Sequence, residues 1–187
     1  MSTLSDHERL ALAIALLRRK ARVSIVHHET GVPREKLRRL HREIHGRSAA
    51  SGQIPMVGGA TIQTRAQQVY AGLFAALYVR YSERDTTRQI DIQAVIAAHD
   101  LYLSLVPQAP RLDFSAAWAI ARDLRVGSAE LRTCGVCEVS YLVSSASRLA
   151  PTCPFCAIYA RRGGRHETPL VPPELPGEAP EDGEIPP

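Results

Sequence analysis

The chain has 187 residues, of which 45% are hydrophobic, enough for one domain with appendages or for two small domains. No apolar run approaches the roughly 18 residues of a membrane-spanning helix, which excludes an integral membrane protein of that kind. The opening residues MSTLSDHERL contain no basic segment followed by an apolar one, so we expect a cytoplasmic protein without an export signal.

Charge is distributed unevenly along the chain. The formal net charge is +4, but residues 167–187 hold six acidic residues and no basic ones. Residues 1–166 therefore carry 23 basic and 13 acidic residues, a net charge of +10. Of the basic residues, 21 are arginines, whose planar guanidinium group pairs with phosphates and with guanine edges. This favours a nucleic-acid partner, although a GC-rich genome would also explain the choice of arginine over lysine.

The N-terminal third predicts helices separated by short turns. Hydrophobic spacing indicates a helix over residues 7–20, and then either its continuation or a second helix over 21–30. Gly31 allows the positive φ that ends a helix, and Pro33 suits the first position of the next one, over 34–45. A helix, a short glycine turn and a second helix match the helix-turn-helix outline, in which the second helix enters the major groove of DNA.

The outer side of the 34–45 helix is expected to be strongly basic. Five cations within nine residues would repel one another in an isolated helix, so a polyanion is a natural partner. The alternative is a solvated basic helix on an ordinary helical bundle. His27 departs from the outline, because a small residue usually lets the two helices approach at that position. The candidate DNA-contacting residues of this helix are Arg34, Lys36, Arg38, Arg39 and Arg42.

A glycine- and proline-containing loop over residues 47–63 precedes three further helices. The first, 64–81, is apolar around most of its circumference and is expected in a core or an interface. The second begins at a cap on Thr86 or Thr87 and ends near Val106, and we expect residues 64–106 to hold a protein partner. The third is capped by Asp113, ends near Val126 and buries Trp118 and Ile120. The expected inward residues of the second helix are Ile90, Ala94, Ala97, Leu101 and Leu105, with His99 in the interior.

The only cysteines of the chain follow the spacing C-x2-C-x15-C-x2-C, which is typical of a zinc site. Each pair spans a tight turn that aims two sulfur atoms at one ion, and four protein ligands leave no open position for catalysis. One alternative is a pair of structural disulfides, which a reducing cytosol disfavours. The others are four buried thiols and a single iron ion held by the same four thiolates. The predicted ligands of one structural Zn2+ per chain are Cys134, Cys137, Cys153 and Cys156.

The segment between the cysteine pairs alternates Val139, Tyr141 and Val143, which predicts a short strand and a small zinc-ribbon-like module. Such a module is too small to bury much core, so the ion should supply much of its folding energy. No phosphate-binding glycine loop or nucleophile motif is present, and we expect no enzyme. The predicted mainly α organisation is a helical domain over 1–127 that starts with the helix-turn-helix-like part, a zinc module over 128–165 and a disordered acidic, proline-rich tail over 166–187.

The order of these parts resembles the FlhC family, subunits of the bacterial flagellar master regulator. The resemblance covers roughly residues 8–162, and the chain departs from the family in its acidic tail and in the absence of aromatic residues over 56–61. The matching stretches are Lys36-Leu37-Arg38-Arg39-Leu40, Gly52-Gln53-Ile54-Pro55, Leu101-Tyr102-Leu103 with a proline soon after, and Ala117-Trp118 before the cysteines.

The resemblance implies a DNA-binding transcriptional activator of flagellar genes that acts as a hetero-oligomer with FlhD and recruits RNA polymerase to double-stranded promoter DNA. It also places the four cysteines on the family's zinc ligands. Arg161 and Arg162 behind the zinc module are further candidate DNA contacts. The alternative function is a zinc-ribbon interaction module that binds an acidic protein without touching DNA, and an iron-containing electron-transfer protein ranks third.

Overall fold

The computed structural model describes residues 3–50, 54, 62–83, 85–107 and 112–161. Within these residues the chain is mainly α-helical with one two-stranded antiparallel sheet, which confirms the predicted fold class. The predicted tail over 166–187 and most of the loop over 51–61 lie outside the described residues. The elements are α1 (Thr3–Arg18), α2 (Val23–Thr30), α3 (Arg34–His45), α4 (Arg65–Tyr81), α5 (Ile92–Leu105), α6 (Phe114–Arg125), β1 (Ala129–Thr133), β2 (Ser140–Ser144) and α7 (Pro154–Arg161).

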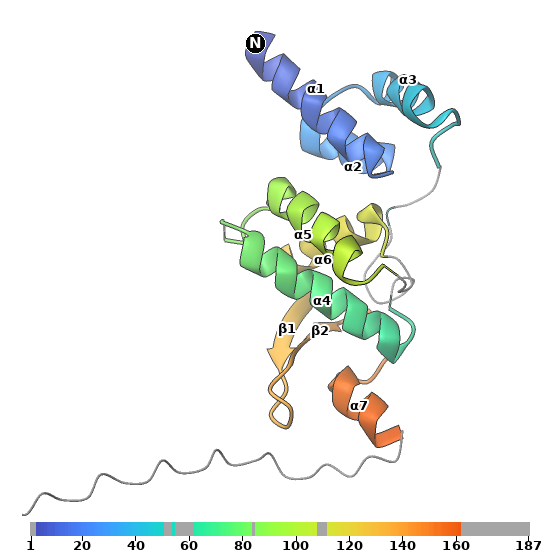
Figure 1. Cartoon of the computed structure of the whole chain (residues 1–187). Helices are drawn as coiled ribbons and strands as arrows, with labels where there is room; N and C mark the ends of the chain where they lie inside the picture. Colours follow the sequence, from blue (N-terminus) through green and yellow to red (C-terminus); the bar gives the residue numbers. More distant parts are fainter. Residues whose placement is uncertain (1–2, 51–53, 55–61, 84, 108–111, 162–187) are drawn as a thin grey trace, which may run out of the picture.

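The helices form two groups, with the sheet attached to the second (Figure 1). Helices α1, α2 and α3 pack on one another at the N-terminal end. Helix α4 packs against α5 and α6, and on its other side against the β1–β2 hairpin and α7. In the hairpin, Ala129 lies opposite Ser144 and Thr133 opposite Ser140. None of the described helices is both long enough and apolar enough to cross a membrane.

Glycines end both helices of the helix-turn-helix unit, as predicted. Gly31 and Gly46 have φ values of 67° and 66°, and each donates its backbone N–H to the carbonyl four residues earlier. The predicted role of Pro33 at the first helical position was wrong by one residue. Its ψ of 136° is extended, so it precedes α3 as the N-cap, and its carbonyl accepts the N–H of Leu37 at 3.1 Å.

Replacing Gly31 by alanine is expected to lower the free energy of unfolding by about 1–2 kcal/mol, the cost of a side chain in the left-handed region. The new Cβ would also lie 2.7 Å from Nη2 of Arg9, whose Nε donates to the Thr30 carbonyl at 2.7 Å. Urea unfolding measures the loss. Gly135→Ala is the control, because no atom lies within 4 Å of its added Cβ. Equal losses of stability in the two variants would contradict the conclusion that the left-handed φ at position 31 requires glycine.

The start of α5 differs from the prediction. Thr64 begins α4 as expected, in a reciprocal cap with Gln67. Helix α5, however, begins at Ile92, because the Asp91 carboxylate accepts the N–H groups of the first turn at 3.1 Å. Thr87 instead donates its hydroxyl to Asp85 in the turn before the helix. The predicted cap on Thr86 or Thr87 was therefore wrong, since aspartate at 91 offers the stronger acceptor nearer the apolar segment.

The inward face of α5 also differs in part. Ala94 is buried as predicted, but Ala97 and Leu105 are exposed, with Leu105 at 54%. The buried row is instead Val95, Ala98, His99 and Tyr102, with His99 in the interior as expected. Helix α5 is apolar on two adjacent rows, and the row that contacts α4 and α6 is the one that becomes buried.

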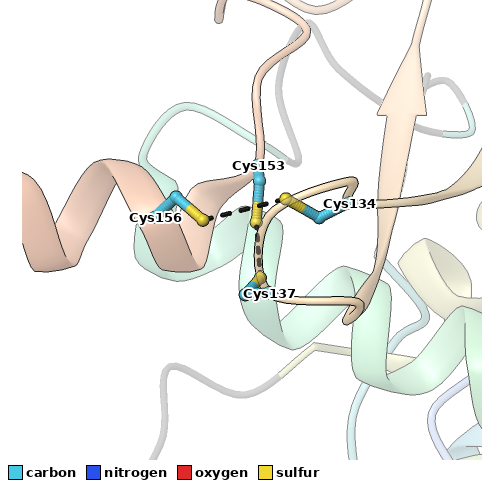
Figure 2. Close-up of side chains that lie close together, drawn as sticks. All are labelled: Cys134, Cys137, Cys153 and Cys156. Atoms are coloured by element: carbon cyan, nitrogen blue, oxygen red, sulfur yellow. Dashed lines mark hydrogen bonds between the residues drawn. The ribbon is translucent and has the colours of Figure 1, made fainter. Parts of the chain in front are cut away.

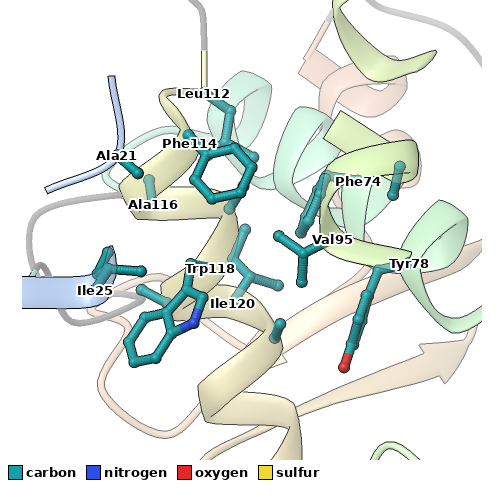
Figure 3. Close-up of a cluster of buried hydrophobic side chains, with 14 of the residues drawn as sticks. Ala21, Ile25, Phe74, Tyr78, Val95, Leu112, Phe114, Ala116, Trp118 and Ile120 are labelled. Carbon is teal, nitrogen blue, oxygen red and sulfur yellow. The ribbon is translucent and has the colours of Figure 1, made fainter. Parts of the chain in front are cut away.

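The core joins the N-terminal helices to the rest of the molecule (Figure 3). Helix α6, capped by Asp113 as predicted, contributes Phe114, Trp118 and Ile120, all at most 4% exposed. Phe74 and Tyr78 of α4 and Val95 of α5 meet this helix on one side, and Ala21 and Ile25 lie beside it on the other. Three polar contacts span the same junction, namely Arg19–Asp100, the Arg22 N–H to Ser115 Oγ, and Trp118 Nε1 to Glu29.

Candidate functional site

The four cysteines converge at the end of the hairpin (Figure 2). Cys134 and Cys137 follow β1, Cys153 directly precedes α7, and Cys156 lies in its first turn. All four Sγ atoms lie within 4.8 Å of one another, with Cys134 to Cys156 at 3.7 Å and Cys137 to Cys153 at 3.6 Å. A tetrahedron of sulfurs about 2.3 Å from one ion has edges of about 3.8 Å. The cluster of free thiols therefore could hold a metal ion such as zinc.

Backbone geometry prepares this donor set for a cation. Glu138 adopts a left-handed φ of 57°, and its N–H donates to the Cys134 carbonyl at 2.9 Å, which closes the first turn. Backbone N–H groups of Cys137 and Val136 lower the pKa of Cys134 to about 6. Burial, together with the neighbouring thiols, raises the pKa of Cys156 to about 12. A bound cation would favour the thiolate form of all four, and binding releases protons, so metal affinity rises with pH.

The zinc-ribbon-like module shares the main core instead of standing alone. Leu142 of β2 is 1% exposed and belongs to the cluster that contains the α4 and α6 side chains. Gln68 of α4 donates from Nε2 to the Leu142 carbonyl at 2.8 Å. A Cβ on Gly72 would lie only 3.3 Å from the Leu142 nitrogen, so the glycine permits this close approach. Packing on α4 thus supports the hairpin in addition to any ion, which sequence reasoning did not anticipate.

Arg65 on the first turn of α4 holds the segment that leads into Cys153. Its Nη1 donates to the carbonyls of Ala150 and Thr152 at 2.9 and 3.1 Å, and its Nη2 donates to Thr152 Oγ1 at 2.9 Å. Sequence reasoning missed this residue, because its partners lie more than 80 positions away and no local spacing indicates them.

Arg65→Gln is expected to speed metal release by about tenfold or more, since charge-assisted hydrogen bonds contribute roughly 1.5–3 kcal/mol. The measurement is transfer of zinc from the loaded full-length chain to a chromogenic chelator. Arg80→Gln, at the exposed end of the same helix, is the matched control and should release zinc at the wild-type rate. The same rate in Arg65→Gln and wild type would show that this arginine does not hold the cysteine loop.

The basic residues predicted to contact DNA lie in two separate places. All five candidates on α3 are exposed, and Arg39 forms an ion pair with Glu43 at 3.8 Å. Arg161 is exposed at the end of α7, on the opposite side of the molecule from α3 (Figure 1). Arg162 lies outside the described residues. The structure therefore brings together the candidates on α3, which are Arg34, Lys36, Arg38, Arg39 and Arg42, but does not bring Arg161 near them.

Histidines fix the backbone of the helix-turn-helix unit. Nδ1 of His27 donates to the Val32 carbonyl at 2.8 Å, so its ring lies over the turn between α2 and α3. Nδ1 of His41 donates to the Arg47 carbonyl at 3.1 Å, and Nε2 of His45 to the Leu17 carbonyl at 2.8 Å. A carbonyl only accepts hydrogen bonds, so each of these ring nitrogens carries a proton. His27 is thus accommodated by a hydrogen bond where the usual outline has a small residue.

A helix-turn-helix unit with a basic second helix, followed by a four-cysteine cluster, is an architecture typical of transcription regulators. The family described as "Flagellar transcriptional activator (FlhC)" matches residues 1–168, and the chain belongs to this family. The resemblance inferred from the sequence is thereby confirmed. The chain is a flagellar transcription regulator and, as expected, its family is not one of enzymes.

Several curated relatives share the description "Flagellar transcriptional regulator FlhC". The protein of Cupriavidus metallidurans is 30% identical over 144 residues, which cover 75% of this chain and 66% of the relative, slightly under two thirds of its length. That of Cupriavidus necator is 29% identical over 175 residues, or 91% of this chain and 85% of the relative. The Verminephrobacter eiseniae protein is 27% identical over 168 residues, covering 87% and 88%.

Proposed function

We propose that this chain activates flagellar genes by binding promoter DNA through the α2–α3 unit. The observation that carries the proposal is the set of five exposed cations on α3, the second helix of that unit. Among the described residues, Arg34, Arg38 and Arg42 form no ion pair with a carboxylate, so their charge is available to phosphates. Base edges in the major groove would be read by side chains nearer the outer face of the helix.

The proposal extends to the partners and to the ion. One structural Zn2+ per chain, held by the four cysteines, would fix α7 and its Arg161 in place. A FlhD-like subunit would complete a hetero-oligomer in the cytoplasm, and the complex would recruit RNA polymerase. Among the large apolar side chains described over 64–106, Val79, Tyr81 and Leu105 are exposed, so we expect them to contribute to the partner surface.

Binding of the chain, co-expressed with its FlhD-like partner, to a flagellar promoter duplex and to a random duplex tests the proposal. We expect tighter promoter binding by about three orders of magnitude or more, with a steep salt dependence. Lys36→Ala with Arg39→Ala should cost roughly 1–3 kcal/mol for each base that the replaced side chains read, seen as relaxed sequence preference.

Ser145→Ala, at an exposed position after β2 and outside both α3 and the expected partner surface, is the control and should bind as wild type does. Equal, weak binding to both duplexes by the wild-type complex, together with capture of an acidic protein, would instead favour the interaction-module alternative.

A further inference from the structure

A concave basic pocket of about 540 Å3 lies between the start of α2, helix α3 and the segment after it. Among the described residues that line it, four are arginines and none is acidic. Two serines add hydroxyl groups. The polar lining residues are Arg22, Ser24, Arg34, Arg38, Arg42 and Ser48.

Three of these arginines form one row along α3. Arg34, Arg38 and Arg42 are spaced four residues apart, so successive Cα atoms are about 6 Å apart and the row spans about 12 Å. The next row differs, because its Arg39 is partly compensated by the ion pair with Glu43. A single phosphate group is too small to engage the whole row, so the row can contact at least two phosphoryl groups at once.

The pocket is also held in place by the rest of the fold. The backbone N–H of Arg22 donates to Ser115 Oγ of α6 at 3.2 Å, which fixes the start of α2 against the body. No side chain caps this helix end, whose partial positive charge adds to that of the arginine row. The charge of the pocket is therefore preorganised before any ligand binds.

We infer that this pocket is a binding site for two adjacent phosphoryl groups. The inference rests on the proposed function and deepens it, because in the DNA complex the two groups are neighbouring backbone phosphates beside the groove that α3 enters. Contacts to phosphates set affinity and carry no sequence preference. Lys36 and Arg39 line a neighbouring depression of about 320 Å3, which shares Arg42 with the pocket. We therefore assign phosphate binding to Arg34 and Arg38, and base reading to Lys36 and Arg39.

The test compares two double variants of the full chain, purified with its FlhD-like partner, on promoter and random duplexes over a salt series. Arg34→Gln with Arg38→Gln alters the pocket, and Lys36→Gln with Arg39→Gln alters the other depression. The pocket variant should bind both duplexes about tenfold or more weakly, to the same extent, and its slope of log affinity against log salt should fall by about 1.8 because two phosphates are no longer neutralised. The other variant should lower the promoter-to-random ratio.

A second arm separates the two sources of the ligand, since free polyphosphates share this chemistry. Titration calorimetry with inorganic pyrophosphate should show binding to the wild type and about tenfold weaker binding to the pocket variant. If the complex binds no DNA, the proposed function fails. Weaker pyrophosphate binding by the pocket variant would then still establish the phosphate-binding site, with a free polyphosphate as its ligand. Unchanged DNA salt slope together with unchanged pyrophosphate affinity overturns the inference, as does a loss confined to the promoter duplex. Equal melting temperatures of the variants exclude misfolding as the cause.

Discussion

Cys153→Ser is expected to lower the metal content from one ion per chain to near zero and to release α7 from α4. Cys153 is 6% exposed and lies between the Arg65-bound loop and α7, so losing its thiolate leaves three ligands in a closed site. A structural zinc ion contributes on the order of 10 kcal/mol to the folding of small zinc modules. Elemental analysis of the purified chain measures the loss and, with a visible spectrum, distinguishes zinc from iron.

The effect should be confined to one part of the hairpin. Leu142, in the middle of β2, packs in the main core and accepts a hydrogen bond from Gln68, so we expect amide exchange at this residue to stay slow in Cys153→Ser. Exchange around Cys134 and in α7 should become fast. Ser145→Ala, at an exposed position next to β2, is the control and should keep the ion. One ion per chain retained in Cys153→Ser would refute the four-cysteine assignment.

Trp118→Ala is expected to destabilise the fold by about 3–5 kcal/mol, the usual cost of removing a buried indole. Its Nε1 donates to Glu29 of α2 at 2.7 Å, its ring meets the His28 ring edge-on at 5.8 Å, and the Arg122 guanidinium lies over it at 5.7 Å. The contacts with Glu29 and His28 join the helix-turn-helix unit to α6, and Arg122 covers the ring from α6 itself. Thermal and urea unfolding of the full chain measure the loss of stability.

Trp118→Phe distinguishes the contribution of the hydrogen bond to stability from that of the buried ring. It keeps most of the buried surface but leaves the Glu29 carboxylate, whose side chain is only 12% exposed, without its indole donor. We expect a loss of roughly 1–3 kcal/mol and a weaker affinity for DNA, because the last turn of α2, which leads into α3, is no longer held by this hydrogen bond. Tyr81→Ala, at a residue 46% exposed, should change stability by less than about 0.5 kcal/mol. Equal losses at positions 118 and 81 would show that the junction is not stabilised by the indole.

Signals confined to short stretches of sequence predicted much of this molecule. The helix ends at Gly31 and Gly46, the cap at Asp113 and the convergence of four cysteines all depend on residues that act on their immediate neighbours. Each of these features depends on one specific property of the residue. The glycines permit a positive φ, the aspartate supplies a carboxylate acceptor, and the cysteines supply soft ligands at a fixed spacing.

The features that the sequence did not predict depend on contacts between distant segments. Helix α5 has two apolar rows, and only packing against α4 and α6 selects Val95 and Tyr102 over Ala97 and Leu105. The anchoring of the cysteine loop by Arg65 and of the hairpin by Gln68 joins positions more than 70 residues apart. Periodicity reports the amphipathic character of one helix, but it contains no information about which partner that helix meets.

The opposite placement of α3 and α7 constrains the footprint of any complex with DNA (Figure 1). The helices of the α4–α6 body lie between them, and two helix layers at about 10 Å each separate the ends by roughly 20 Å. That distance corresponds to about six base pairs along a duplex at about 3.4 Å per step. If one chain contacts DNA through both Arg161 and the α3 cations, it should therefore protect two separated stretches of the duplex from cleavage. A single compact protected stretch would show that only one end of the molecule contacts the DNA.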